Sequence, residues 1–174
     1  MANTITTQEL EILSNKAISA KSTAYCPYSK FRVGASLLTH SGEYITGANV
    51  ENVSFPVGTC AERVAFGTAV VNGHKEFKAV AVASDITPGA SPCGMCRQFM
   101  REFLTPSVPI YMYDGQGGHI VKTMGEVFSP TGIYSALWCG VVVQVGDVGF
   151  AIFLSLVLYI CLVGQYLQWD NIIT

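Results

Sequence analysis

Apolar residues recur with two different periods along the first part of the chain, and these periods predict its elements. Thr6 and Glu9 have the spacing of a capping box, and apolar residues follow them at helical spacing, which predicts a helix over 6–22. Two apolar stretches within 31–48 flank a Ser-Gly turn, so we expect a β-hairpin there.

Helices and strands alternate after this hairpin. We expect helices at 61–72 and 94–104, and Gly73 closes the first of them, because glycine commonly follows a helix C-terminus. Short apolar runs at 77–84 and 108–114 have the length of buried strands. The order strand, helix, strand, helix, strand predicts an α/β sandwich with a mixed sheet.

The composition changes near residue 130. No Lys or Arg follows Lys122, and residues 148–164 carry no charge over 17 positions, the lower limit for a membrane span. We therefore divide the chain into a domain over 1–130 and a hydrophobic tail over 131–174. Four explanations of the tail stay open: a membrane segment at 148–164, a buried helix, an inserted hydrophobic segment, and an error in the gene prediction.

The charge and the cysteine content indicate which partners and which cellular compartment to expect. The net charge is −2 and the ten Lys and Arg are scattered, so we expect no nucleic-acid partner. The N-terminal residues lack the basic start and apolar stretch of a signal peptide, which favours a cytoplasmic protein. In a reducing compartment, a Cys-x-x-Cys pair is more typical of a metal or redox site than of a structural disulfide.

Three cysteines stand at the expected starts of the two later helices. Cys60 precedes one helix, whereas Cys93 and Cys96 open the other and lie one turn apart. Unpaired N–H groups and the helix dipole favour thiolates at such positions, and thiolates bind zinc. No histidine is well placed as a fourth ligand, and an open fourth position predicts a catalytic site with one zinc ion per chain.

Two charged residues follow Cys60 closely. On the predicted helix Glu62 lies near the metal, but the reach of its side chain differs from that of the Cys60 sulfur. We therefore expect Glu62 to transfer protons rather than to bind zinc. Arg63 is the next residue, and we expect its guanidinium to donate hydrogen bonds to the cysteine sulfurs and to offset the charge of three thiolates.

A wider set of motifs surrounds these residues. Cys60 and Cys93 stand 33 residues apart, and the spacing Cys-x-Glu followed by Pro-Cys-x-x-Cys is the signature of zinc deaminases. Two further stretches are Tyr28–Ala35 (YSKFRVGA) and Gly47–Asn52 (GANVEN). With these motifs the chain resembles the small homotetrameric cytidine deaminases, over about residues 6–128.

This resemblance implies the fold, the reaction and the assembly. The fold would be a three-layer α/β sandwich with a mixed, mostly five-stranded sheet and helices on both faces. The reaction would be the zinc-dependent deamination of cytidine and deoxycytidine by water to uridine and deoxyuridine, a step of pyrimidine salvage. The chain would form a homotetramer in which loops of neighbouring subunits complete each site.

The resemblance also assigns roles to single residues. Phe31 would pack on the pyrimidine ring, whereas Asn49 and Glu51 would bind the 3′-hydroxyl of the sugar. The backbone of Ala61 and the side chain of Glu62 would contact the edge of the base, and Glu62 would protonate N3 as C4 is attacked. An amide and a carboxylate suit a hydroxyl, because together they donate and accept hydrogen bonds.

Two alternative functions stay open beside nucleoside deamination. One is a deaminase of a cytosine-containing antibiotic, although Glu51 favours a ribose because a carboxylate that faces another sugar would be left unpaired. The other is a non-catalytic zinc protein whose tail prevents assembly, since the sequence after Pro130 departs from the usual ending of the family. A membrane partner is expected only if the tail is a genuine part of the protein.

Overall fold

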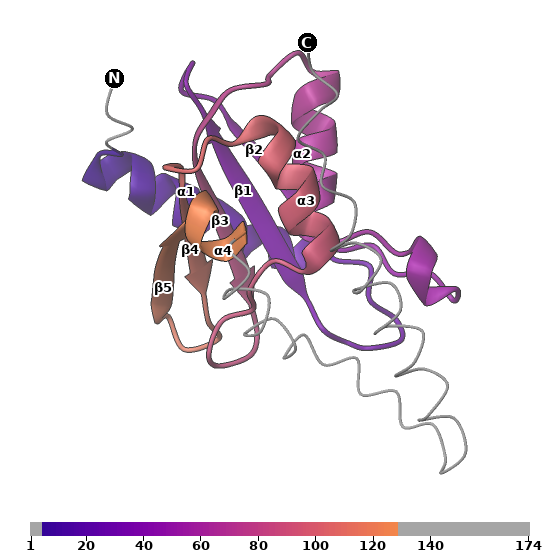
Figure 1. Ribbon diagram of the computed structural model, residues 1–174. Coiled ribbons are helices and arrows are strands. Elements are labelled where there is room, and N and C mark those ends of the chain that lie inside the picture. The colour runs from indigo at the N-terminus through magenta and orange to yellow at the C-terminus, as the bar shows by residue number, and fades with distance from the viewer. Residues whose placement is uncertain (1–4, 129–174) are drawn as a thin grey trace. The chain divides into compact units, whose positions relative to one another are not determined.

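The computed structural model describes residues 5–128, which all belong to one unit of the chain, Met1–Cys139. Within this part, five strands form a sheet in the order β2-β1-β3-β4-β5 (Figure 1). The strands are β1 (Val33–Thr39), β2 (Tyr44–Ala48), β3 (Phe77–Ser84), β4 (Pro109–Tyr113) and β5 (His119–Thr123). The helices are α1 (Thr7–Ala20), α2 (Ala61–Val71), α3 (Gly94–Phe103) and α4 (Met124–Phe128), with 3₁₀ turns η1 (Lys21–Thr23) and η2 (Phe55–Val57).

The sheet is mixed, as the sequence predicts. β3 and β4 run parallel, whereas β1 pairs antiparallel with β2 and with β3, and β5 pairs antiparallel with β4. Two parallel strands need a crossover connection, and α3 provides it. Because this crossover starts where β3 ends, it places the N-terminus of α3 at that end of the sheet.

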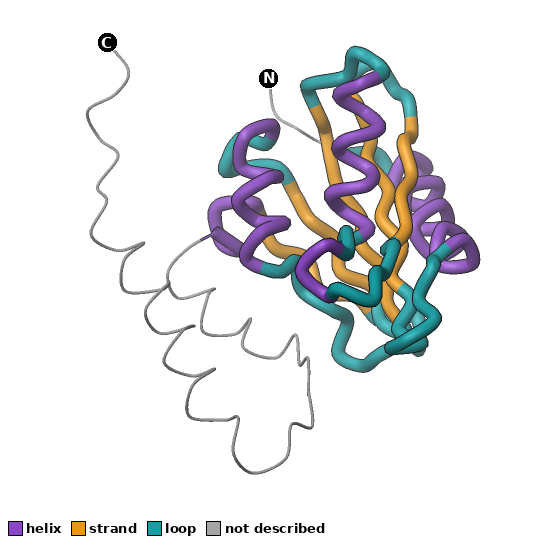
Figure 2. The backbone as a smooth tube through the Cα atoms, turned by 90° about the vertical axis from the view of Figure 1, so that its right-hand side faces the viewer, coloured by secondary structure: helices purple, strands orange, loops and turns teal. Residues whose placement is uncertain are grey.

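Helices cover both faces of the sheet and give the predicted three layers (Figures 1 and 2). α1 lies on one face, where Leu13 and Ala17 pack against alternate residues of β3 and β4. α2, α3 and α4 lie on the other face and share one apolar core with the opposite set of strand residues. The five-stranded α/β sandwich is therefore confirmed, and it sets α2 and α3 next to each other.

Two glycines let helices approach the sheet closely. A Cβ atom on Gly34 of β1 would lie 2.2 Å from the carbonyl oxygen of Ala17 in α1. A Cβ atom on Gly47 of β2 would lie 2.5 Å from the backbone nitrogen of Ala65 in α2. Both separations are far shorter than van der Waals contact, so a larger residue would push the helix away. Gly47 thereby sets the distance between the sheet and α2, the helix that follows Cys60.

Most of the elements predicted from the pattern are confirmed. α1 begins with the predicted capping box, in which Thr6 and Glu9 exchange hydrogen bonds. α2 is followed by Gly73 with a φ of 91°, a conformation that glycine adopts without strain. The pattern predicts no separate element after residue 114, whereas the structure adds β5 and α4. β5 escapes detection because four of its five residues are exposed, so its side chains show no alternation.

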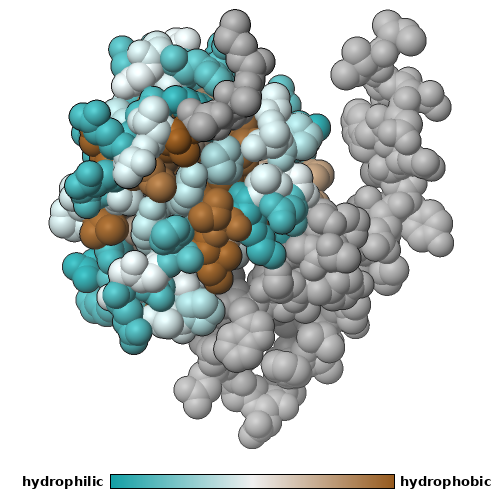
Figure 3. Space-filling view, turned by 90° about the vertical axis from the view of Figure 1, so that its left-hand side faces the viewer, coloured by the Kyte–Doolittle hydropathy of each residue, from teal (hydrophilic) through white to brown (hydrophobic). Residues whose placement is uncertain are grey.

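Polar and apolar side chains share the surface of the described residues. On the face shown in Figure 3, apolar residues form separate patches between hydrophilic ones. The helices between residues 5 and 128 are all too short or too polar to cross a bilayer. The domain boundary at residue 130, the tail 131–174 and the membrane segment 148–164 lie outside the described residues and stay predictions.

Candidate metal centre

Three cysteines bring their sulfur atoms together at the starts of α2 and α3. Cys60 is the N-cap of α2, Cys93 is the N-cap of α3, and Cys96 lies in the first turn of α3. The Sγ atoms of Cys60 and Cys93 are 3.8 Å apart, and those of Cys93 and Cys96 are 3.5 Å apart. All three lie within 4.8 Å of one another. The sulfurs meet because both helices pack on the same face of the sheet.

This cluster fits a zinc ion. Tetrahedral zinc with Zn–S bonds of about 2.3 Å places neighbouring sulfurs about 3.8 Å apart, close to the observed 3.5 and 3.8 Å. Thiolates are also the ligands that zinc prefers in such sites. Among residues 5–128, no fourth cysteine, histidine or carboxylate belongs to the cluster. Three protein ligands are the number found in catalytic rather than structural zinc sites.

The three sulfurs differ in their affinity for protons. Hydrogen bonds with the Cys60 and Cys96 side chains and with the N–H groups of Cys96 and Met95 hold the pKa of Cys93 far below its ordinary value. Hydrogen bonding to Cys93 raises the pKa of Cys60 to about 11, and hydrogen bonding to Cys60 and Cys93 raises that of Cys96. Cys93 thus favours the thiolate, the form that binds zinc, mainly because of its two sulfur neighbours and less because of the N–H groups at the start of α3.

Arg63 places a cation beside the cluster. Its Nη2 atom donates a hydrogen bond to the carbonyl oxygen of Gly58 at 3.2 Å and lies 3.9 Å from Cys60 Sγ. The contact expected from the sequence is therefore present. The bond to Gly58 holds the guanidinium in place beside the sulfur of Cys60.

Glu62 is buried at the start of α2, with 4% of its surface exposed. Burial raises the pKa of its carboxyl group to about 7, and the negative sulfur of Cys93 acts in the same direction. Such a group takes up and releases protons near neutral pH, as general acid–base catalysis requires. Within the described residues, the cluster of possible metal ligands does not include Glu62.

Asn49 binds the backbone of the segment 28–33, which carries Phe31. Its Nδ2 atom donates to the carbonyl oxygen of Phe31 at 2.9 Å, and its Oδ1 atom accepts from the N–H of Val33 at 2.8 Å. Sequence reasoning assigned Asn49 to a sugar hydroxyl and missed these two bonds. Each amide atom keeps a second hydrogen-bonding capacity, so Asn49 can hold this segment and still meet a ligand.

Glu51 binds the same segment through both carboxylate oxygens. Its Oε2 atom accepts from the N–H groups of Tyr28 at 3.0 Å and Ser29 at 3.3 Å, and the Ser29 hydroxyl donates to Oε1. Burial acts to raise the pKa of Glu51, but these hydrogen bonds outweigh it, so the pKa lies below its ordinary value. Glu51 is therefore an ionised acceptor at neutral pH, with lone pairs left for a ligand.

Arg97 is a residue of this region that sequence reasoning missed. It is buried, with 3% of its surface exposed, and its Nε atom donates to the carbonyl oxygen of Pro92 at 2.7 Å. Its Nη2 atom donates to the Ser91 hydroxyl at 3.1 Å. These bonds fix the chain that leads into Cys93. The available signal was its position directly after the Cys-x-x-Cys motif.

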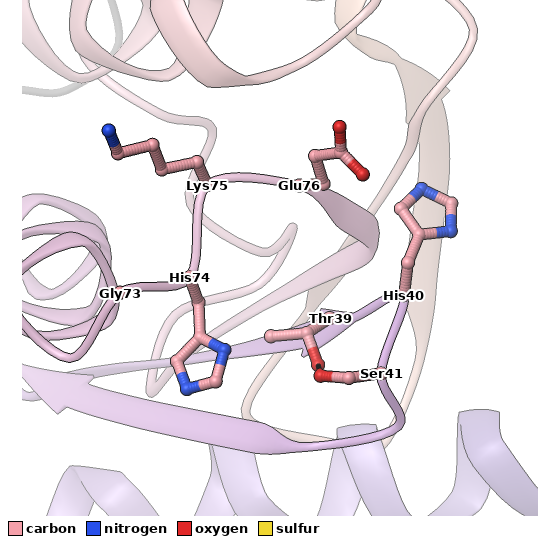
Figure 4. Close-up of a pocket in the computed structure, with 7 residues that line it drawn as sticks. All are labelled: Thr39, His40, Ser41, Gly73, His74, Lys75 and Glu76. Carbon is pink, nitrogen blue, oxygen red and sulfur yellow. Dashed lines mark hydrogen bonds between the residues drawn. The ribbon is translucent and has the colours of Figure 1, made fainter.

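A pocket at the far end of α2 contains two histidines. Its lining residues are Thr39, His40, Ser41, Gly73, His74, Lys75 and Glu76 (Figure 4). The imidazoles of His40 and His74 point in different directions in Figure 4, and His74 Nε2 lies 2.7 Å from Glu43 Oε2. Because these two imidazoles do not converge, we assign them no metal role.

Comparison with known proteins decides the family. Residues 7–112, more than half of the chain, match the family described as the cytidine and deoxycytidylate deaminase zinc-binding region. This chain belongs to that deaminase family. The resemblance expected from the motifs is therefore confirmed, and so is zinc as the metal that corresponds to the cysteine cluster.

The chain is also similar to individual proteins and to a solved structure that are named cytidine deaminase. It is 44% identical to a cytidine deaminase of Sporosarcina psychrophila over 109 residues, which cover 63% of this chain and 80% of that protein. It is 42% identical to a cytidine deaminase of Halalkalibacterium halodurans over 117 residues, 67% of this chain and 89% of that protein. The crystal structure of a Burkholderia pseudomallei cytidine deaminase matches with a TM-score of 0.66 and 37% identity, over 71% of this chain and 96% of that one.

Proposed function

We propose that this protein is a zinc-dependent cytidine deaminase, which hydrolyses cytidine and deoxycytidine to uridine and deoxyuridine and releases ammonia. Relatives named cytidine deaminase support this substrate class. The observation that carries the proposal is a buried carboxyl group, Glu62, next to three sulfurs whose separations suit a catalytic zinc site.

Glu62 moves the protons in this mechanism. When bound, zinc supplies Lewis acidity, which makes water acidic enough to be a nucleophile at neutral pH. Glu62 takes a proton from the water that adds to C4 of the cytosine ring and passes it to N3. It then carries the second proton of that water to the amino group, which leaves as ammonia. Arg63, 3.9 Å from Cys60 Sγ, offsets the negative charge of the thiolates.

The segment 28–33 and its two side-chain partners hold the nucleoside. The Phe31 ring packs on the pyrimidine, and the backbone of Ala61 contacts the edge of the base. Asn49 and Glu51 bind the 3′-hydroxyl of the sugar with the hydrogen-bonding capacity that their bonds to this segment leave. The lowered pKa of Glu51 supports this role, because an ionised carboxylate is a strong acceptor for a hydroxyl.

We also propose that the protein assembles as a homotetramer. The loop 50–58 exposes apolar side chains, with Val53 76%, Phe55 60% and Val57 64% exposed. Tyr28 meets Phe55 edge-on with 6.5 Å between ring centroids, which extends this apolar surface towards the nucleoside segment. Surfaces of this kind are commonly buried by partners. Light scattering should give the mass of four chains, and a mass of one chain would contradict the assembly.

An antibiotic substrate is the second candidate. The chain is 31% identical to the blasticidin-S deaminase of Bacillus cereus over 134 residues, 72% of this chain and 92% of that protein. Glu51 favours the nucleoside, because the lone pairs that its bonds to the segment 28–33 leave unused can accept a hydrogen bond from a sugar hydroxyl. We therefore expect kcat/KM to be higher for cytidine and deoxycytidine than for blasticidin S.

The deciding experiment uses the purified full chain. We expect about one zinc ion per chain, and loss of the cytidine absorbance at a rate that a strong chelator abolishes and added zinc restores. A chain that binds zinc but turns over none of the three substrates would support the non-catalytic alternative and contradict the proposed function.

A further inference from the structure

Ser29 joins two residues that the proposed function places against the nucleoside. Its hydroxyl donates to Oε1 of Glu51 and accepts from the backbone N–H of Phe31 at 3.0 Å. A hydroxyl has one proton to donate and lone pairs to accept, so a single oxygen atom serves both bonds. The sugar-binding carboxylate and the ring-stacking residue are thus linked through the Ser29 oxygen.

The turn between Ser29 and Phe31 needs such support. Lys30 has a φ of 58°, a left-handed conformation that residues with a Cβ atom adopt at a cost. The bond from the Phe31 N–H to the Ser29 hydroxyl spans Lys30, and the Lys30 N–H donates to the carbonyl oxygen of Cys26 at 3.1 Å. Serine side chains commonly stabilise turns in this way. Without the hydroxyl, the Phe31 N–H loses its partner and the turn loses the bond that spans Lys30.

The segment that contains Ser29 also orients the carboxylate of Glu51. The N–H groups of Tyr28 and Ser29 hold its Oε2 atom, and the Ser29 hydroxyl holds Oε1. Loss of the hydroxyl would free one oxygen and let the carboxylate rotate about its last bond. A group that is already oriented before binding loses less conformational freedom when the ligand arrives.

We propose that Ser29 is a positioning residue for nucleoside binding, which presents the carboxylate of Glu51 to the 3′-hydroxyl and fixes the turn that carries Phe31. This inference rests on the proposed function, because it needs a nucleoside in that place. Ser29 itself touches neither the reacting atoms nor the metal; it acts through its two neighbours.

The test compares cytidine with 3′-deoxycytidine, which lacks the hydroxyl that Glu51 binds. Ser29→Ala should raise KM for cytidine about tenfold, which is the usual magnitude for the loss of a hydrogen bond to a charged group. The same substitution should raise KM for 3′-deoxycytidine by much less. Because the chemistry at C4 is untouched, kcat should stay within about twofold and the zinc content should not change. Ser29→Thr keeps the hydroxyl and should restore most of the affinity.

Ser107→Ala is the matched control. Ser107 lies on the exposed turn before β4, and its hydroxyl is 3.2 Å from the hydroxyl of Thr105. This variant should leave KM for both nucleosides unchanged. An equal loss for cytidine and 3′-deoxycytidine in Ser29→Ala, or no loss for either, would overturn the inference.

Binding measurements separate this inference from the proposed function. Calorimetry in a Glu62→Gln background, where turnover is suppressed, gives the affinities of the two nucleosides with and without Ser29→Ala. If the original protein fails to deaminate cytidine but the affinity contrast appears, the reaction is wrong and the role of Ser29 stands. If the protein deaminates cytidine and the contrast is missing, the role of Ser29 is wrong.

Discussion

The sulfur atoms of Cys60 and Cys93 lie 3.8 Å apart although 33 residues separate them in the sequence. Each residue caps a helix, and the two helices start side by side because both pack on one face of the sheet. The cluster is thus a product of tertiary packing, and the low pKa of Cys93 comes first from its hydrogen bonds with the other two sulfurs and then from the N–H groups at the start of α3.

Removal of one sulfur should remove the metal. Cys96→Ser replaces a thiolate by a hydroxyl, a poor zinc ligand, and leaves two protein ligands. We expect elemental analysis after dialysis to show zinc falling from about one ion per chain to a small fraction of that. Cys26→Ser is the control, because Cys26 is a free thiol outside the cluster and its loss should leave the zinc content intact. Full retention of zinc in Cys96→Ser would exclude this sulfur as a ligand.

Loss of the carboxyl group should separate catalysis from metal binding. Glu62→Gln keeps the size of the buried side chain but cannot transfer protons, so kcat for cytidine should fall by about 10²–10⁴. The zinc content should be unchanged, because Glu62 does not belong to the ligand cluster. Glu11→Gln, at an exposed position of α1, should behave like the original protein. Turnover that survives in Glu62→Gln would assign proton transfer to another group.

The metal centre could be predicted because its signals are local. Cysteine at a helix start, with a glutamate two residues later, is visible in the sequence, and the order of elements already sets the two helices beside one sheet. Ser29 could not be found in this way. Its role depends on Glu51, 22 residues away, and on a left-handed residue between Ser29 and Phe31.

Prediction of the fold from the sequence was limited in the same way at the fifth strand. β5 lies at the edge of the sheet with most of its residues exposed, so burial leaves no period in its sequence. The turn before it, from Asp114 to Gly118, was the available signal, because glycine-rich turns after a strand are typical of hairpins. Asn49 is a similar case, since its bonds to the backbone of Phe31 and Val33 arise only when β1 and β2 pair.

The contact between β2 and α2 should tolerate no added carbon atom. A Cβ on Gly47 would lie 2.5 Å from the nitrogen of Ala65 and 2.6 Å from the carbonyl oxygen of Ala61, and backbone cannot yield as a side chain does. We expect Gly47→Ala to lower the free energy of unfolding by about 1–3 kcal/mol, measured by chemical denaturation. Gly67 lies on α2 as well, but a Cβ atom there would meet no atom of the surrounding elements within 4 Å. Gly67→Ala should gain about 0.5–1 kcal/mol from helix propensity, and equal effects of the two substitutions would contradict the close approach at Gly47.

The ion pair between Lys78 and Glu9 should make part of the stability depend on pH. Lys78 Nζ lies 2.8 and 2.7 Å from the two carboxylate oxygens of Glu9, and this bond is the main reason why the pKa of Glu9 falls from 4.5 to about 2. A carboxylate whose pKa is lower in the folded state stabilises the fold above its unfolded pKa, and the effect disappears as pH falls through the folded pKa. Lys78→Met should therefore lower the unfolding temperature at pH 7, and its difference from the original protein should shrink below pH 4.5 and vanish near pH 2. Lys75→Met, at an exposed lysine without an ion pair among residues 5–128, should show no such pH-dependent difference. A difference for Lys78→Met that stays constant from pH 7 to pH 2 would show that the substitution acts through packing instead of charge.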